Sequence, residues 1–312
     1  MRRDGDERDA REMSDQVVVY EVSGAVATVT MNRPEVANAQ DSQLIDELDA
    51  AFDLAGSDDA VRVVVLAGAG KHFSSGHDLK ALVGEAAPDS WRAMRETPEG
   101  KFHHERVMYY ERCKRIYDFR KPTIAAVQGS CVAAGLMLAC MCDLIVAADD
   151  ARFSNPVLRM TGAGVEILVE PWEIGIRKAK ELLWTAQTLD AKEALQLGLV
   201  NRVVPAAELM ERAHALAEEI ALVPPITAQV VKESINHAAD LMGKSDSWRY
   251  HFMAHQWAHN TRTALNALEH RRQQRSMKDI FADRDRGDAP PGGSGPPGGS
   301  DGSGKPGGDA KS

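Results

Sequence analysis

Two glycine-rich turns carry the chemistry that this sequence offers most clearly. One lies in "AGAGKHFSSGHDLK", residues 67–80, where an apolar run ends and a helix is expected to begin. The other opens "GSCVAAGLMLACMCD", residues 129–143, a small-residue turn that leads into a helix. Each turn offers backbone N–H groups at a helix start, and two such donors aimed at one carbonyl oxygen form an oxyanion hole, worth about 10²–10³ in rate per donor. The pair predicts stabilisation of negative charge on a carbonyl oxygen.

The helix after the second turn carries no acid, base or nucleophile other than cysteines. The chain has four cysteines, and the last three, Cys131, Cys140 and Cys142, lie in or beside this apolar helix. Cys140 and Cys142 are two residues apart, so they face different sides of a helix and cannot form a ligand pair. We therefore predict no metal site, and the thiols indicate a reduced, cytoplasmic protein.

Charge and composition exclude several classes of partner. The formal net charge of −9 over 312 residues argues against nucleic acid or an anionic membrane as the main partner. Neither a signal peptide nor a membrane-spanning run is visible. Residues 1–14 are nearly all charged, and residues 284–312 form a Gly/Pro/Ser-rich tail, so both ends are expected to be disordered.

The elements that position the two turns alternate between strands and helices. Residues 16–32 predict a hairpin that turns at Ser23 and Gly24, and Asp41 is expected to cap a helix over residues 42–57. Further strands and then helices are predicted at 61–68, 122–129, 143–154, 177–186 and 190–198. This pattern predicts strand–strand–helix units over residues 15–205 and a helical region over 206–283. Residues 84–106 are expected to form an irregular loop, with or without one short helix.

Four segments in this order resemble the crotonase, or enoyl-CoA hydratase/isomerase, superfamily. They are "TVTMNRPEVANAQ", "VVVLAGAGKHFSSGHDLK", "KPTIAAVQGSCVAAGLMLACMCDLIVAADDARFS" and "GIRKAKELLWTAQTLDAKEALQLGLVNRVV". The resemblance covers residues 17–283. It implies an α/β fold, a crotonase-type spiral of ββα units with a C-terminal helical region that mediates trimerisation. It also implies homotrimers or dimers of trimers, and an acyl-CoA thioester as ligand. Coenzyme A would be part of the substrate, and no separate cofactor is expected.

By position, the resemblance places the oxyanion hole at the backbone N–H groups of His77 and Ala134. These groups would polarise the thioester carbonyl and stabilise an enolate; the side chain of His77 is not required. The small residues Ala133 and Gly135 would let the thioester approach the turn.

The chain departs from the family's hydratases where they carry two catalytic glutamates. By position the first falls on Met137 and the second on Val157, and neither side chain transfers a proton. Some isomerases and dehalogenases of the family carry a catalytic aspartate that would fall on Ala163. Glu166 lies three residues later, about one turn along the same predicted helix, and is the candidate base, its pKa raised by burial. The alternative is that Glu166 is a first-turn acid favoured by the helix dipole.

The resemblance also implies a set of substrate-binding positions. Cations near the nucleotide would be Arg33, Lys71 and Lys80, with Ala37 and Ala39 beside them. The remaining positions of the set are Ser75, Gly76, Asp78, Leu79, Ala133, Gly135, Met137 and Val157. Asp78 is also expected to cap the helix that begins at Leu79. His103 and His104 are expected to be solvated, and Tyr109 or Tyr110 to pack in the core or line the pocket.

Two functions of different class fit these residues. The first is an enzyme that stabilises a thioester enolate and moves a proton with Glu166, which favours double-bond isomerisation over hydration. The second is a catalytically silent homologue that binds acyl-CoA, favoured by the apolar Met137 and Val157. A thioesterase or C–C hydrolase needs a base near the carbonyl carbon, and the sequence offers none.

Overall fold

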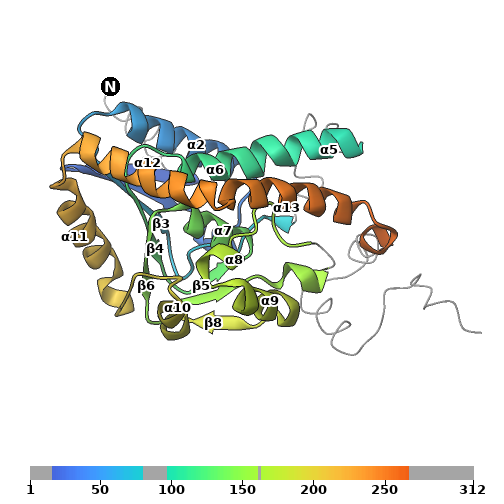
Figure 1. Cartoon of the computed structure of the whole chain (residues 1–312). Helices are drawn as coiled ribbons and strands as arrows, with labels where there is room; N and C mark the ends of the chain where they lie inside the picture. The colour runs from blue at the N-terminus through green and yellow to red at the C-terminus, as the bar shows by residue number, and fades with distance from the viewer. Residues whose placement is uncertain (1–15, 80–96, 161–162, 267–312) are drawn as a thin grey trace, which may run out of the picture.

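A computed structural model describes residues 16–79, 97–160 and 163–266, and its main feature is a six-stranded sheet (Figure 1). The strand order is β1-β2-β3-β4-β6-β9; β1 and β2 are antiparallel and all other neighbours are parallel. These strands are β1 (Val18–Ser23), β2 (Val26–Met31), β3 (Val63–Gly68), β4 (Thr123–Val127), β6 (Leu144–Ala148) and β9 (Arg202–Val204). A three-stranded sheet joins β5 (Ser130–Val132), β7 (Arg152–Ser154) and β8 (Thr188–Asp190).

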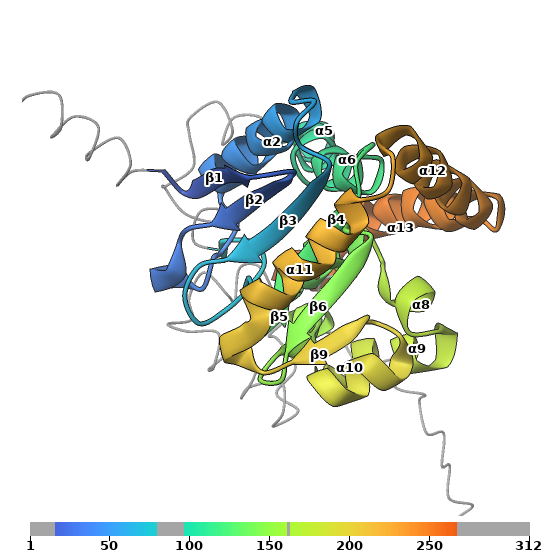
Figure 2. The ribbon, with the colours of Figure 1, turned by 90° about the vertical axis from the view of Figure 1, so that its left-hand side faces the viewer.

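Helices cover both faces of the large sheet, as Figure 2 shows for the face under α11 (Leu209–Ala221). Alternate residues of β3 divide between the faces: Val63 and Val65 pack with α11, whereas Val64 and Leu66 pack into the larger core. That larger core contains α2 (Ser42–Ser57), α6 (Arg112–Tyr117) and α7 (Ala134–Met141). Although α11 falls in the predicted C-terminal helical region, it is a layer of the sheet core.

Local sequence signals gave the correct element boundaries at several points. The hairpin turns at Gly24, whose φ of +59° suits glycine. Asp41 caps α2 by accepting a hydrogen bond from Leu44 N–H at 2.9 Å. Asp190 and Glu193 form a reciprocal capping box at the start of α10 (Ala191–Leu197), and Gly198 ends that helix in the left-handed conformation.

The insert predicted to be irregular is helical from Pro98 onward. A helix α5 (Pro98–Glu105) runs into a π-helical segment η2 (Arg106–Glu111) and then into α6. The expected loop at 84–96 lies outside the described residues. A π-helical turn changes which side chains face a neighbouring element and is frequent at functional sites.

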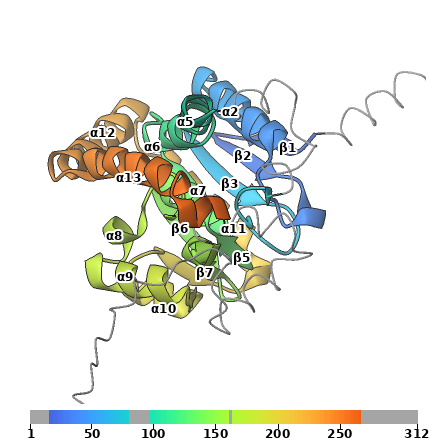
Figure 3. The same ribbon diagram turned by 90° about the vertical axis from the view of Figure 1, so that its right-hand side faces the viewer.

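The C-terminal helices α12 (Pro225–Leu241) and α13 (Lys244–His259) lie to one side of the sheet (Figure 3), and α13 packs Trp248 and Phe252 into the larger core. The smaller helices are η1 (Pro34–Val36), η3 (Pro156–Met160), α8 (Glu170–Glu173), α9 (Ile176–Thr185) and η4 (Ala206–Glu208). Among residues 16–79, 97–160 and 163–266, no helix has the length and apolar character needed to cross a membrane.

Candidate active site

The two glycine-rich turns lie against each other. Ser74 N–H donates to the Ser130 carbonyl at 3.1 Å, and Val132 N–H donates to the Ser74 carbonyl at 2.9 Å. A Cβ atom on Gly76, whose φ is +87°, would lie 2.9 Å from the Val132 oxygen and 3.1 Å from the Ala134 nitrogen. A Cβ atom on Gly135 would lie 2.5 Å from the Ser74 oxygen. Glycine is therefore required at both contact points.

The backbone N–H groups of His77 and Ala134 lie at this contact. Hydrogen bonds from Gln40 N–H to the Gly76 carbonyl (2.8 Å) and from Asp78 N–H to the Gln40 carbonyl (2.9 Å) fix the chain on either side of His77. Ala134 is the first residue of α7. Neither N–H donates a hydrogen bond to any of the residues that the structure describes. Such donors at a helix start are open to an incoming acceptor.

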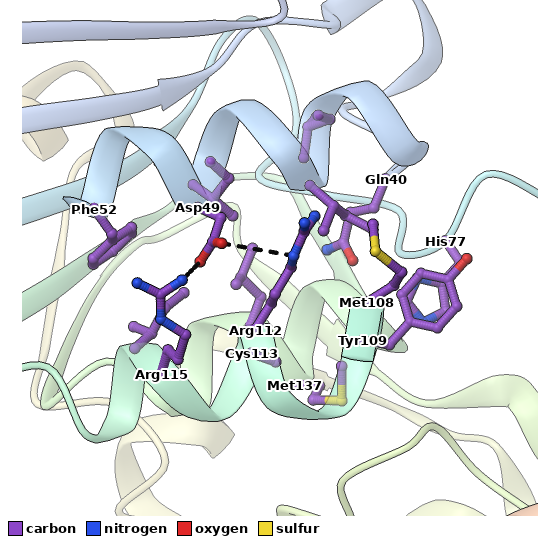
Figure 4. A pocket seen from close by; sticks show the side chains of 15 residues that line it. Gln40, Asp49, Phe52, His77, Met108, Tyr109, Arg112, Cys113, Arg115 and Met137 are labelled. Atoms are coloured by element: carbon purple, nitrogen blue, oxygen red, sulfur yellow. Dashed lines mark hydrogen bonds and ion pairs between the residues drawn. The ribbon is translucent and has the colours of Figure 1, made fainter. Parts of the chain in front are cut away.

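A cavity extends from these turns between α2 and the helical segment η2–α6 (Figure 4). His77, Tyr109 and Met137 line one end of the cavity. Phe52 and Arg115 lie toward the other end, and Asp49 forms ion pairs there with Arg112 (3.6 Å) and Arg115 (2.5 Å) (Figure 4). The walls between are mainly apolar, with Leu44, Ile45, Leu48, Phe52 and Ile116 among the lining residues. The cavity is therefore shaped for an apolar chain with its polar end at the turns.

The His77 side chain, which was not expected to take part, lies within hydrogen-bonding distance of Glu166. His77 Nε2 lies 3.0 Å from Glu166 Oε2, and the two side chains are 12% and 5% exposed. The His77 ring also packs on Tyr109, with 4.2 Å between ring centroids. His77 Nδ1 is buried and has no hydrogen-bond partner. When the Nε2–H group donates this hydrogen bond to Glu166, Nδ1 carries no proton and its lone pair can accept one.

Glu166 differs from its prediction in two respects. It lies in the non-helical segment that precedes α8, not one turn along a helix from Ala163, so a helix dipole does not explain it. Burial alone raises the pKa of its carboxyl, but the charge and hydrogen bond of His77, together with His255, outweigh burial and lower that pKa. The predicted upward shift is therefore wrong, because sequence alone did not reveal the two imidazoles.

Further titratable side chains continue from Glu166 into the gap between α5 and α13. His255 Nε2 lies 3.9 Å from Glu166 Oε1 and 3.4 Å from Glu105 Oε2. Burial lowers the pKa of His251 to about 4 and that of His259 to about 3, so both imidazoles are neutral at neutral pH. The spacing of four residues between His251, His255 and His259 was a visible signal that this helix gathers imidazoles on one face.

Several predicted substrate-binding residues lie beside the turns. Arg33 forms ion pairs with Asp41 (3.0 Å) and Asp78 (3.3 Å), so this cation is internally neutralised. The Ala37 carbonyl accepts a hydrogen bond from Ser75 N–H at 2.9 Å. This contact holds the 33–40 segment against the first turn. Ala39 is buried, Leu79 is half-buried and Lys71 is exposed, whereas Lys80 lies outside the described residues.

The two positions that replace the hydratase glutamates are not equivalent. Met137 lines the cavity, whereas Val157, in η3, packs against the main core and is not among the residues that line it.

His104 was expected to be solvated, and this prediction is wrong: the side chain is 2% exposed and contacts the Tyr109 ring edge-on, with 5.8 Å between ring centroids. His103 is exposed as expected. Tyr109 lines the cavity and Tyr110 packs in the core.

Comparison with known proteins places the chain in a family. Residues 21–275 match the family model described as enoyl-CoA hydratase/isomerase, so the chain belongs to that family and has the crotonase fold. EchA13 of Mycobacterium tuberculosis is 42% identical over 271 residues, 83% of this chain and 85% of that protein. The short-chain-enoyl-CoA hydratase of Clostridium acetobutylicum is 34% identical, over 70% of this chain and 80% of its own length.

Solved structures agree with the sequence matches. An enoyl-CoA hydratase/isomerase from Xanthobacter autotrophicus superimposes with a TM-score of 0.75 at 32% identity, covering 86% of this chain and 97% of that chain. An enoyl-CoA hydratase from Mycobacterium tuberculosis superimposes with a TM-score of 0.65 at 28% identity, covering 78% and 100% of the two chains.

Proposed function

We propose that this protein binds an acyl-CoA thioester and catalyses proton transfer through its enolate, in the manner of a double-bond isomerase. The observation that carries the proposal is the His77 side chain, which lines the cavity, contacts the buried Glu166 at 3.0 Å and keeps Nδ1 without a partner. The names of the relatives above support an acyl-CoA thioester as the substrate class.

The proposed reaction uses both parts of the site. The thioester oxygen accepts hydrogen bonds from the N–H groups of His77 and Ala134, while the apolar cavity takes the acyl chain. His77 Nδ1 removes a proton from C2 of a 3-enoyl thioester, and the electron pair is delocalised over the dienolate. The imidazolium that forms is stabilised by the Glu166 carboxylate, as a buried carboxylate stabilises the histidine of a catalytic triad. Return of the proton to C4 leaves the 2-enoyl thioester.

Hydration is the less favoured reaction for this site. It needs a group that activates water and a second that protonates the adjacent carbon, and a general acid or base contributes about 10²–10⁴ in rate. Met137 supplies an apolar thioether at the cavity wall where the family's hydratases carry a glutamate. A single proton carrier suffices for isomerisation because the same base removes and returns the proton.

The test is deuterium exchange with a panel of saturated, 2-enoyl and 3-enoyl CoA thioesters in D₂O, followed by mass spectrometry and NMR. We expect exchange at C2 or C4 with the wild type, and a loss of about 10²–10⁴ in His77→Gln and Glu166→Gln. His77→Gln keeps its backbone N–H, so acyl-CoA binding should survive. Glu173→Gln is the matched control, because that carboxylate pairs with Lys244 at 3.2 Å and has no contact with His77.

The alternative is a protein that binds acyl-CoA without turning it over, and the apolar Met137 at the cavity wall favours it. Thermal stabilisation by acyl-CoA with no exchange or product on any thioester of the panel would establish this alternative and remove the proton-transfer proposal.

We further propose that the protein is a homotrimer or a dimer of trimers. The support is α12, whose large apolar side chains are exposed in the isolated chain, among them Ile226 (66%), Ile235 (63%) and Leu241 (76%). The molecular mass in solution, measured by light scattering, decides this; a monomer at micromolar concentration would overturn it.

A further inference from the structure

The inference concerns a group of side chains between α5 and α13 that the proposed reaction does not use. His255 and His259 lie four residues apart in α13 and so share one face of the helix, and Glu105 is the last residue of α5. Figure 1 shows these two helices running side by side. Glu105 Oε2 lies 3.4 Å from His255 Nε2 and 3.9 Å from His259 Nδ1. All three donor atoms lie within 4.8 Å of one another.

These separations approach those of a metal coordination sphere. Zinc–nitrogen and zinc–oxygen bonds of about 2.0–2.2 Å in a tetrahedron place neighbouring donors about 3.3–3.6 Å apart. Glu105 and His255 already have that spacing, and both residues are buried, at 3% and 2% exposure. His259 is the outermost of the three, with a side chain 24% exposed, and its Nδ1, 3.9 Å from Glu105 Oε2, would have to move inward to bind the same ion.

The donor set itself is selective. Two imidazoles and one carboxylate, with a fourth position left for water, are the ligands of one class of zinc centre and also suit other first-row transition metals. The Glu105 carboxylate is held in place, because Gln256 Nε2 donates a hydrogen bond to Oε2. Partners of this kind orient metal ligands and affect affinity by about 10–100-fold.

The ammonium group of Lys101 lies beside these three side chains. Its Nζ lies 3.0 Å from His259 Nδ1 and 3.8 Å from Glu105 Oε1. The Lys101 side chain is 23% exposed, so its ammonium group has a route to solvent. We propose that Glu105, His255 and His259 bind a divalent transition-metal ion, with Zn²⁺ as the best match, and that the Lys101 ammonium is the cation that the metal displaces.

The metal would act on two parts of the molecule. It would tie α13 to α5, two helices from distant parts of the sequence, and so hold the helix that runs directly into the cavity-lining segment η2. It would also fix the His255 ring, whose Nε2 is 3.9 Å from Glu166 Oε1, and place a cation one side chain away from the His77–Glu166 pair. The proposal stands on these residues alone and does not depend on the reaction proposed above.

The experiment uses full-length, tag-free protein stripped of metal by a chelator and then titrated with Zn²⁺ by calorimetry. Bound metal is counted by mass spectrometry after dialysis. We expect about one ion per chain, a rise in the midpoint of thermal unfolding, and affinity at least 10-fold weaker in His255→Gln and His259→Gln. Lys101→Met should bind several-fold more tightly, because the competing ammonium is gone.

His251→Gln is the matched control. His251 lies one turn before His255 on the same helix, but its Nε2 contacts the Val165 carbonyl at 2.9 Å, so its loss should leave the affinity unchanged. Co²⁺ in place of Zn²⁺ gives a visible spectrum that reports coordination by these ligands even if a variant is less stable. Less than one-tenth of an ion per chain, or wild-type affinity in both His255→Gln and His259→Gln, would overturn the proposal.

Discussion

The two parts of the candidate site are built by opposite means. The two turns proposed to form the oxyanion hole present main-chain N–H groups, and their closeness depends on small residues, Gly76 and Gly135, at the points of contact. The proposed acid–base part uses two side chains from distant segments, His77 and Glu166. The two turns leave almost no room for an added side chain, whereas the acid–base part depends on which titratable side chains lie in contact. The two parts should therefore fail differently when they are changed.

Among the substitutions that leave His77 and Glu166 in place, the largest effect is expected from Gly135→Ala, which changes the main-chain part alone. The new Cβ would meet the Ser74 oxygen at 2.5 Å, so the two turns must separate. Losing the alignment of one oxyanion donor should lower the exchange rate by about 10²–10³, with His77 and Glu166 unchanged. Deuterium exchange in folded protein, with folding checked by circular dichroism, measures this.

The control is Gly24→Asn in the β1–β2 hairpin, where nothing lies within 4 Å of an added Cβ and asparagine accepts the φ of +59°. If Gly135→Ala kept the wild-type rate, close apposition of the turns would not matter for the chemistry, and the contrast between the two parts would fail.

The same contrast separates what the sequence predicted from what it did not. The turns, the hairpin at Gly24 and the caps at Asp41 and Asp190 depend on residues close in the chain, so local patterns were enough. The family resemblance then supplied the order of elements. The His77–Glu166 contact joins residues 89 apart, and the Gln256–Glu105 hydrogen bond joins residues 151 apart. No local pattern encodes such pairs, which arise only when the helices pack.

The pKa of Glu166 was predicted wrongly because it depends on contacts between residues far apart in the sequence. Its residue type and position beside the pocket marked it as a candidate, but its pKa depends on His77 and His255, which only the folded chain brings close. Whether residues 84–106 contain a short helix was left open for a related reason, and the structure has one at residues 98–105. That segment has little amphipathic pattern of its own, and packing such as Phe102 against Phe252, with centroids 5.3 Å apart, stabilises it.

Outside the site, a substitution of Lys232 breaks an ion pair whose lysine is buried and whose aspartate is partly exposed. Lys232 Nζ lies 2.8 Å from Asp143 Oδ2, and that carboxylate also accepts hydrogen bonds from Thr123 N–H (2.7 Å) and Oγ1 (2.9 Å). Lys232→Met leaves the Asp143 carboxylate, whose side chain is 23% exposed, without its cation and should lower the free energy of unfolding by about 1–3 kcal/mol. The exchange rate of the folded fraction should not change.

Urea unfolding measures the loss in Lys232→Met, with Lys178→Met as the control. Lys178 pairs with Glu181 at 2.9 Å on an exposed helix face, so its removal should change stability little. Equal effects of the two substitutions would show that burial does not distinguish the pairs. A lost exchange rate in folded Lys232→Met would show instead that charges outside the site contribute to the chemistry.

The smallest effect is expected at Ala133, where the main-chain part stores strain. Ala133 has a φ of +52°, which residues with a Cβ rarely adopt, yet its N–H donates to the Ser154 carbonyl at 2.9 Å and its carbonyl accepts from Met137 N–H at 3.0 Å. Such a conformation costs about 1–3 kcal/mol, and glycine relieves it at an entropic cost of about 0.4–1 kcal/mol. Ala133→Gly should therefore raise the free energy of unfolding by about 1 kcal/mol and keep exchange activity.

Ala139→Gly, in the interior of the same helix, is the matched control for this last change. Ala139 is fully buried and has ordinary helical geometry, so glycine there should destabilise by about 1 kcal/mol or more. If the free energy of unfolding, measured in urea, rises in Ala133→Gly and falls in Ala139→Gly, the strain lies at the turn. A loss of stability in Ala133→Gly would mean that the Ala133 methyl contributes more by packing than its backbone conformation costs, and the main-chain part would then depend on side-chain contacts after all.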